Sequence, residues 1–404
     1  MVAATYFDRS AAEAADAADP LAAFRDRFLP HGDDVVAYLD GNSLGRPIRA
    51  VRDAWLDLVD HQWGQRLIRS WAAGPSGGWM DLPETVGNEL GAAMLGAAGG
   101  QTIIADSTTI NLYKAMRAAL ALRPDRRVIL IDRDNFPTDR FVVESIAREF
   151  NYEIRWVAGD FVESIADDVA VVTASHVAYH SGYIADVAAI TARAHEAGAL
   201  VVWDLCHSVG AIPIQLDAWD VDFAVGCTYK FIGGGPGAPA FIYAAARHLG
   251  QLRQPLWGWL GRRDPFEMEQ NYIPAGGIRS MMSGTPTIPG ILAVREGVRL
   301  IGEAGIDAVR AKSVALTEMV LTMYDAVLAP LGFELGSPRD PARRGAHVTI
   351  RRADARELTA EIIARGVIPD FRTPDGIRLG LSPLPASFTE VWDAVEIIRQ
   401  VAVG

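Results

Sequence analysis

The chain contains few cysteines and no long apolar run. Its 404 residues include two cysteines, Cys206 and Cys227, and neither belongs to a C-x-x-C pair. A disulfide framework is therefore not expected, and the reducing cytoplasm is the expected compartment. The first residues, MVAATYFDRSAAEAADAADP, lack the basic start and apolar run of a signal peptide. No uninterrupted apolar stretch approaches the roughly 18 residues of a membrane span.

Positive charge is also scarce. The formal net charge is −12, and no basic stripe of the kind that binds nucleic acid is present. Hydrophobic residues make up 50% of the chain and charged residues 22%, which is ordinary for a soluble globular protein. The length suits one large domain with a smaller companion.

Helical patterns alternate with short apolar runs from about residue 85 onwards. The runs predict strands at 101–106, 126–132, 152–157, 168–175, 199–204, 222–227 and 238–244. Strands separated by helices indicate an α/β fold with a mostly parallel sheet flanked by helices. A helix is predicted over 47–63, with Pro47 in its first turn.

A long helix begins within the stretch 282–305 and leads to a second, smaller α/β pattern. We expect an N-terminal segment at residues 1–44, a large domain at 45–290 and a small C-terminal domain at 291–404. The N-terminal segment is expected to pack near the small domain.

Polar residues follow several of the predicted strands. They are Thr108, Thr109, Asp139, His176, Asp204, His207, Tyr229 and Lys230. Ligands of open α/β sheets bind beyond the carboxyl ends of the strands. Taken singly, each residue has a structural explanation, such as a helix cap or a surface charge. Taken together, they suit pyridoxal phosphate, which needs a helix N-terminus for its phosphate, a lysine for a Schiff base and a carboxylate for its ring nitrogen.

Other chemistries are weaker candidates. Gly41, Ser43 and Gly45 spell the G-x-S-x-G of a hydrolase nucleophile elbow, but only 42 residues precede the serine, too few for the strands that an elbow requires. A metal site built from His176, His180, His207 and Asp204 is conceivable, although no known ligand spacing supports it, and we expect none. The glycine run at 233–237 does not end in the G-K-[ST] of a P-loop.

Ten stretches together resemble the kynureninase family. They are LDGNSLG, WGQRLIRSW, DLPETVGNELG, DSTTINLYK, NFPTD, DLCHSVG, DFAVGCTYKF, GWLG, SGTPTI and GVIPDFRTPDGIRLGLSPL. The resemblance covers residue 38 to the end of the chain. It implies a fold-type I pyridoxal-phosphate enzyme of the class V aminotransferase-like superfamily. The implied reaction is the hydrolytic cleavage of the Cβ–Cγ bond of L-kynurenine or 3-hydroxykynurenine in tryptophan catabolism, which yields L-alanine and anthranilate or 3-hydroxyanthranilate.

The resemblance also implies roles for individual residues. Lys230 would form the Schiff base, and Tyr229 would bind the phosphate and assist proton transfer if its pKa is lowered. The other cofactor-binding residues would be Thr108, Thr109, Phe136, Pro137, Thr138, Asp139, Ser175, Asp204 and His207. Trp259 and Thr285 would reach the phosphate of a neighbouring subunit, which implies a homodimer with shared active sites. Arg378 would bind the substrate's α-carboxylate, and the substrate pocket would include Asn42, Ser43 and Trp71.

One position departs from the family pattern. Where the family carries a histidine that faces the aromatic end of the substrate, this chain carries Arg262. A ring-substituted kynurenine, or another γ-keto amino acid with an acidic group, could therefore be preferred. An aminotransferase or β-lyase on the same fold remains an alternative, as does a non-catalytic protein that kept the fold. A cysteine desulfurase would need a reactive cysteine on a mobile loop.

Overall fold

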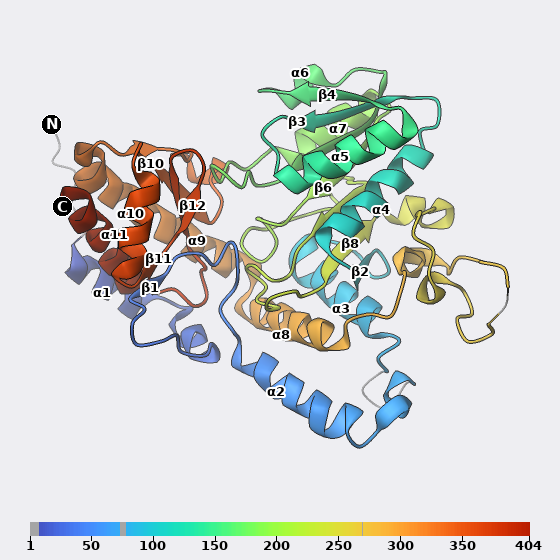
Figure 1. Cartoon of the computed structure of the whole chain (residues 1–404), viewed down its shortest axis with the longest axis horizontal. Helices are drawn as coiled ribbons and strands as arrows, with labels where there is room; N and C mark the ends of the chain where they lie inside the picture. The colour runs from blue at the N-terminus through green and yellow to red at the C-terminus, as the bar shows by residue number, and fades with distance from the viewer. Residues whose placement is uncertain (1–7, 73–77, 269) are drawn as a thin grey trace.

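A seven-stranded sheet lies at the centre of the larger part of the molecule (Figure 1). The computed structural model describes residues 8–72, 78–268 and 270–404. The strand order is β2-β8-β7-β6-β5-β3-β4. The strands are β2 (Thr102–Ala105), β3 (Val128–Asp132), β4 (Glu153–Val157), β5 (Val169–Ser175), β6 (Leu200–Asp204), β7 (Phe223–Gly226) and β8 (Ala240–Ala244). Strand β8 runs antiparallel to both neighbours, and the other pairs are parallel, so the predicted mostly parallel sheet is confirmed.

Helices cover both faces of this sheet. Alternate residues of a strand point to opposite faces, and they enter two different cores. Leu130 and Val172 pack with α3 (Leu82–Leu90), α7 (Val187–Glu196) and α8 (Ile288–Ala304). Ile129 and Val171 pack with α4 (Thr108–Ala121) and α5 (Pro137–Phe150). The short helix α6 (Phe161–Ser164) follows β4. Burial on both faces explains why the strands read as continuous apolar runs.

A four-stranded antiparallel sheet forms the centre of the smaller part, at the left of Figure 1. Its order is β12-β13-β10-β9. The strands are β9 (Glu334–Leu335), β10 (His347–Arg351), β12 (Asp370–Arg372) and β13 (Gly376–Gly380). Helices α9 (Ile306–Met323), α10 (Ala355–Ala364) and α11 (Phe388–Val403) supply most of the remaining core.

The N-terminal segment packs on this smaller part. Helix α1 (Arg9–Ala18) lies beside α11, where the Asp16 carboxylate accepts hydrogen bonds from the backbone amides of Phe388 and Thr389 at 2.9 and 3.0 Å. Strand β1 (Ala37–Tyr38) pairs in parallel with β11 (Val367–Ile368). The N-terminal segment therefore contacts the smaller part, and the division into three segments with boundaries at residues 44 and 290 stays a prediction.

The helix predicted over 47–63 begins later than expected. Helix α2 covers Arg49–Asp57 and continues as a π-helix over Leu58–Trp63. Pro47 precedes the helix instead of forming its first turn, because its carbonyl accepts a hydrogen bond from the Leu29 amide at 2.8 Å. Figure 1 shows α2 at the lower edge of the molecule.

One helical stretch of the described residues, Ile306–Leu331, is long and apolar enough by length and composition to cross a membrane. Close to half of its apolar window is buried inside the protein. Its residues Leu316, Val320 and Leu328 belong to the core of the smaller part. The stretch therefore has the character of a core helix.

Candidate active site

Lys230 and His207 meet at the carboxyl end of the large sheet. Lys230 follows β7 and His207 follows β6, and the Lys230 Nζ lies 2.8 Å from the His207 Nε2. The ring of Phe136 also lies near this amine, with its centroid 6.0 Å from Nζ. Burial and the charge of Lys230 hold the pKa of His207 well below its usual value. His207 is therefore neutral at physiological pH, and its Nε2 can accept a hydrogen bond from the lysine.

The NSLG turn lies directly against the backbone of this lysine. The Gly45 amide donates to the carbonyl of Tyr229 at 2.8 Å. A Cβ at position 45 would stand 2.2 Å from the Lys230 carbonyl oxygen, so glycine is required for this close approach. Ser43 accepts a hydrogen bond from Arg378, and no histidine among the described residues is bonded to it. Among the described residues, Ser43 therefore lacks the histidine partner that a nucleophile elbow requires.

Asp204 lies at the end of β6 within a network of buried polar groups. Its carboxylate accepts hydrogen bonds from the Cys206 amide at 2.8 Å and from the Ser175 hydroxyl at 3.2 Å. The same hydroxyl lies 2.7 Å from the side-chain oxygen of Asn135. The network fixes the direction in which the carboxylate of Asp204 points.

A second carboxyl group, that of Asp139, lies close to this network. Asp139 is in the first turn of α5, which begins with Pro137 and Thr138 directly after Phe136. Burial and the negative charge of Asp204 raise the pKa of Asp139 well above its usual value. Burial and the neighbouring charge therefore favour the protonated form of Asp139.

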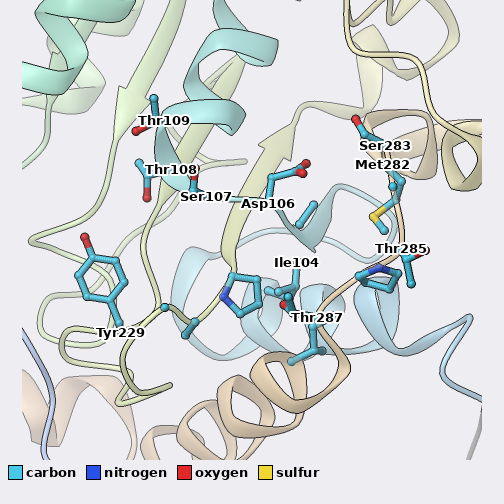
Figure 2. A pocket seen from close by; sticks show the side chains of 17 residues that line it. Ile104, Asp106, Ser107, Thr108, Thr109, Tyr229, Met282, Ser283, Thr285 and Thr287 are labelled. Carbon is cyan, nitrogen blue, oxygen red and sulfur yellow. The ribbon is translucent and has the colours of Figure 1, made fainter.

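A cavity of about 400 Å³ opens beside the N-terminus of α4 (Figure 2). Thr108, Thr109 and Tyr229 line one side of it, and Thr285 lies on the other side. Ser107 caps the helix through a hydrogen bond from the Ile110 amide, so the first backbone amides of α4 lie close to the cavity. A helix N-terminus with hydroxyl groups around it is a site for a phosphate group.

The surroundings of Tyr229 shift its ionisation. Burial raises the pKa of Tyr229 far above its usual value in the chain alone, and the lowered pKa considered for the cofactor-bound site stays a prediction. The phenol is therefore neutral across the physiological range in the chain alone. In that state it can donate a hydrogen bond or a proton, but it cannot act as a base.

Arg378 faces this region from the small sheet. Its buried guanidinium donates to the Tyr179 carbonyl at 2.9 Å, to the Ser43 hydroxyl at 2.7 Å and to the Asp370 carboxylate at 2.5 Å. Burial, and next the charge of Arg372, lower the pKa of Arg378 to about 10. The guanidinium remains charged at neutral pH and is held in a fixed direction.

Asn42 precedes Ser43 and is fully buried. Neither its side-chain oxygen nor its side-chain nitrogen has a hydrogen-bond partner among the described residues. A buried amide without partners is costly unless something else pairs with it. Asn42 is therefore available to a bound molecule or to water.

Three predicted residues have contacts away from Lys230 within the single chain. Trp71 packs edge-on against Trp79, with ring centroids 5.5 Å apart. Trp259 donates to the Thr285 hydroxyl at 3.3 Å. Arg262 is buried and donates to the backbone carbonyls of Asn271 and Asp264. Their roles toward a substrate or a second subunit stay predictions.

Several residues of this region were not predicted from the sequence. They are Asn135, Tyr179, Asp370, Lys114 and His347. Buried Lys114 bonds the Asp106 carboxylate at 2.5 Å and the Met281 carbonyl at 2.8 Å, which joins two walls of the cavity. The strand-end rule could have found Asn135 and Tyr179, since both follow strands of the large sheet.

The alternative chemistries find little support in this geometry. Burial lowers the pKa of His176 to about 4, and its ring packs edge-on against Trp219. Within the described ranges, no group of three potential ligands is placed to hold a metal ion. Both cysteines are buried and free, and a hydrogen bond with Cys227, together with burial, raises the pKa of Cys206. Neither thiol is the exposed, reactive group that a desulfurase needs.

Comparison with solved structures supports the fold. A cysteine desulfurase from Escherichia coli superposes with a TM-score of 0.79 at 16% identity, covering 94% of this chain and 98% of that one. A cysteine desulfurase from Thermococcus onnurineus superposes with a TM-score of 0.77 at 16% identity, covering 91% and 95%. At this identity the likeness establishes the fold, which is that of fold-type I pyridoxal-phosphate enzymes.

Comparison with known sequences establishes the family. Residues 309–398 match the family model described as the kynureninase C-terminal domain. The kynureninase of Deinococcus radiodurans is 42% identical over 398 residues, which cover 98% of this chain and 96% of the relative. The kynureninase of Pseudomonas fluorescens is 41% identical over 398 residues, with 96% and 94% coverage. The chain belongs to the kynureninase family.

Proposed function

We propose that this protein is a pyridoxal-phosphate-dependent hydrolase that cleaves the Cβ–Cγ bond of L-kynurenine, 3-hydroxy-L-kynurenine or both. The products are L-alanine and anthranilate or its 3-hydroxy form. The observation that carries the proposal is the position of buried Arg378, which faces the strand ends bearing Lys230 and Asp204 in a chain of this family. The alternatives of an aminotransferase, a β-lyase or a non-catalytic protein are not favoured.

The residues of the site fit the cofactor. The cavity at the start of α4 would receive the phosphate, with Thr108 and Thr109 as its hydroxyl donors. Asp204 would pair with the ring nitrogen, and the Phe136 ring would cover one face. Asp139 has a buried carboxyl oxygen without a partner in the described ranges, which leaves hydrogen-bonding capacity for a bound group. When bound, pyridoxal phosphate supplies an electron-withdrawing ring that stabilises negative charge at the substrate's α-carbon.

Arg378 would bind and orient the substrate. A guanidinium binds a carboxylate through two parallel hydrogen bonds, which fix direction as well as position. Asp370 and Ser43 already hold this guanidinium, so little freedom is lost when the substrate binds. The substrate's α-carbon would then lie toward Lys230, whose amine is the base that takes the α-proton.

Tyr229 would serve as the proton donor. Because burial keeps the phenol neutral, Tyr229 can give a proton or a hydrogen bond to the substrate's γ-oxygen as water adds to that carbonyl. This role accounts for a tyrosine directly beside the lysine, and it needs only that the phenol is protonated at neutral pH.

Arg262 bears on the choice between substrates. Its guanidinium is held by the carbonyls of Asn271 and Asp264, so it supports its own loop within the chain. We propose that it acts on ring preference through the position of this loop. Relative rates on kynurenine and 3-hydroxykynurenine for the native protein and for Arg262→His test this role; identical ratios would reject it.

We further propose a cytoplasmic homodimer with shared sites. Two segments expose large apolar side chains. One includes Trp55, Leu56, Val59 and Trp63, and the other includes Trp257, Trp259, Phe266 and Met268. Exposed apolar groups of this number are typical of a surface that a partner covers. Light scattering of the purified protein measures the oligomeric state.

Product analysis without any keto-acid acceptor tests the reaction class. A hydrolase forms alanine and an aromatic acid from kynurenine alone. An aminotransferase needs an acceptor for turnover, and a β-lyase forms pyruvate and ammonia. Pyruvate in place of alanine would reject the proposed function.

A further inference from the structure

His347 is a buried histidine at the contact between the two sheets. It begins β10 of the small sheet and is fully buried. Its ring meets the ring of His207 edge-on, with centroids 5.7 Å apart. Lys230 also contacts His207, with its Nζ 2.8 Å from the His207 Nε2. His207 therefore contacts both the reactive lysine and a histidine from the other part of the chain.

The hydrogen bonding of this pair is incomplete within the chain. When the His207 Nε2 accepts a hydrogen bond from the lysine, the ring proton must reside on Nδ1. That Nδ1 is buried and has no partner among the described residues, and the same holds for both nitrogens of His347. A buried donor without an acceptor loses its hydration without compensation, which is unfavourable. His347 is the neighbouring side chain that can accept from His207, by a small rotation or through one water.

A fourth polar side chain lies on the same face of the small sheet as His347. Gly380 is the cross-strand partner of His347, so the two residues share one face of the small sheet. A Cβ at Gly380 would stand 1.9 Å from the side-chain oxygen of Asn42, which places that amide on the same face. Asn42 is fully buried, and both ends of its amide lack partners in the described part of the chain.

Glycines make the space for this arrangement. A side chain at Gly380 would displace the Asn42 amide. On another side, Gly182 approaches His347 so closely that a Cβ there would lie 3.3 Å from Nε2. The ring of His347 thus occupies a tight space on the face of the sheet opposite to the apolar core behind β10, to which the adjacent Val348 belongs.

We propose that His347 is a positioning residue that holds His207 in the tautomer and orientation needed by Lys230, within a buried chain that runs Lys230–His207–His347–Asn42. Arg378 lies on the strand next to His347 and on the same face, two residues before Gly380. This row of four side chains therefore links the small sheet, where Arg378 would bind the substrate carboxylate, to the lysine of the large sheet. Burial, with the nearby charges of Arg378 and Lys230, holds the pKa of His347 well below its usual value, so both histidines are neutral.

The inference rests on the proposed function only in that Lys230 carries the cofactor. The variants are His347→Phe, which keeps an aromatic ring without nitrogens, and His347→Gln, which keeps a polar group. The control is Val348→Ala, which removes volume from the other face of the same strand. The readouts are kcat and KM for kynurenine, and the pH midpoint of the visible absorbance of the cofactor-loaded enzyme, which reports the ionisation around Lys230 and needs no turnover.

For His347→Phe we expect a shifted absorbance midpoint and a fall in kcat of about tenfold or more, since a misplacement of about 1 Å can cost a hundredfold. KM should change less than kcat, and His347→Gln should recover part of the loss. Val348→Ala should lower thermal stability and leave the midpoint unchanged. If His347→Phe has the native midpoint and kcat, or behaves as Val348→Ala does, the proposal is wrong.

Two further measurements keep the test decisive. If His347→Phe does not fold, His347→Met replaces it, because a flexible thioether fills irregular space without a strong acceptor. The double variant with His207→Asn should be no worse than His207→Asn alone, since His347 acts through His207; additive losses would overturn the proposal. A shifted midpoint in a protein that does not cleave kynurenine would leave the inference standing and reject the proposed function alone.

Discussion

Arg378 and Ser43 are hydrogen-bonded at 2.7 Å although 335 positions separate them in the chain. The bond joins the NSLG turn to the small sheet. The same turn contacts the backbone at Tyr229 and Lys230 through Gly45. One short segment therefore connects the guanidinium proposed to bind the substrate with the lysine proposed to act on it.

Arg378→Lys should weaken substrate binding. A lysine lacks the planar pair of donors, and it cannot bond Ser43, Asp370 and a carboxylate together. We expect KM to rise by about tenfold or more, which corresponds to ~1.4 kcal/mol per tenfold. The matched control is Arg351→Lys, which alters an exposed pair with Asp375. Equal KM values for the native protein and Arg378→Lys would contradict the proposed role.

Tyr229→Phe should reduce turnover and leave the cofactor bound. Loss of one positioned proton donor typically costs 10²–10⁴-fold in rate, and we expect about a hundredfold in kcat. The control is Tyr243→Phe, which removes a buried hydroxyl bonded to Asp217 at 2.8 Å, outside the site. Steady-state kinetics and cofactor absorbance are measured on both variants. Native turnover in Tyr229→Phe would reject the proton-donor role.

Asp222→Asn should destabilise the fold, particularly above pH 4. Burial alone would raise the pKa of Asp222, but hydrogen bonds with His195 and His248 outweigh it and hold the pKa far below its usual value. A carboxylate whose pKa is lowered by folding adds stability above its unfolded pKa of about 3.9, and this stability is lost as the pH falls through the folded pKa. Removing one partner of a buried ionic cluster costs about 3 kcal/mol.

The same cluster has a second pH limit. The hydrogen bond with Asp222 raises the pKa of His195, so its contribution is complete below the unfolded histidine pKa of about 6.5 and is lost as the pH rises through the folded pKa. Urea unfolding at pH 5, 7 and 9 measures both effects. Asp168→Asn, at an exposed pair with Arg155, is the control and should cost less than about 1 kcal/mol. An equal loss in the free energy of unfolding for the two variants would show that the buried cluster contributes no more stability than an exposed ion pair.

Subunit mixing tests the shared sites. Lys230→Ala should be inactive and Trp259→Ala weak, each as a homodimer. If each site takes its lysine from one subunit and its tryptophan from the other, one site of each mixed dimer is native. Random mixing in equal amounts therefore restores about a quarter of all sites. Activity is measured after the two variants are unfolded and refolded together. Activity no higher than the sum of the separate variants would mean that each site belongs to one subunit.

Much of the fold follows from periodicity. The buried strands are continuous apolar runs because helices cover both faces of the sheet. Stretches such as Val169–Ser175 show this pattern in the sequence. The start of α2 could not be predicted, since the Leu29 amide, a tertiary partner, takes the carbonyl of Pro47.

Those site residues that directly follow predicted strands could be identified from the sequence. Lys230, His207 and Asp204 come together because parallel strands end at one edge. The ionisation of the site residues could not be predicted from the sequence, since the raised pKa of Tyr229 results from burial that no local sequence pattern encodes. His347 begins a strand of the other sheet, and its contact with His207 depends on how the two parts of the chain pack.

The proposed reaction is the hydrolytic cleavage of kynurenine at the site around Lys230. The most direct measurement incubates the cofactor-loaded protein and its Lys230→Ala variant with L-kynurenine, without a keto acid, and quantifies alanine and anthranilate. We predict both products in equal amounts from the native protein and neither from the variant above background. Cofactor-loaded native protein that forms neither product, or that forms anthranilate without alanine, would contradict the account.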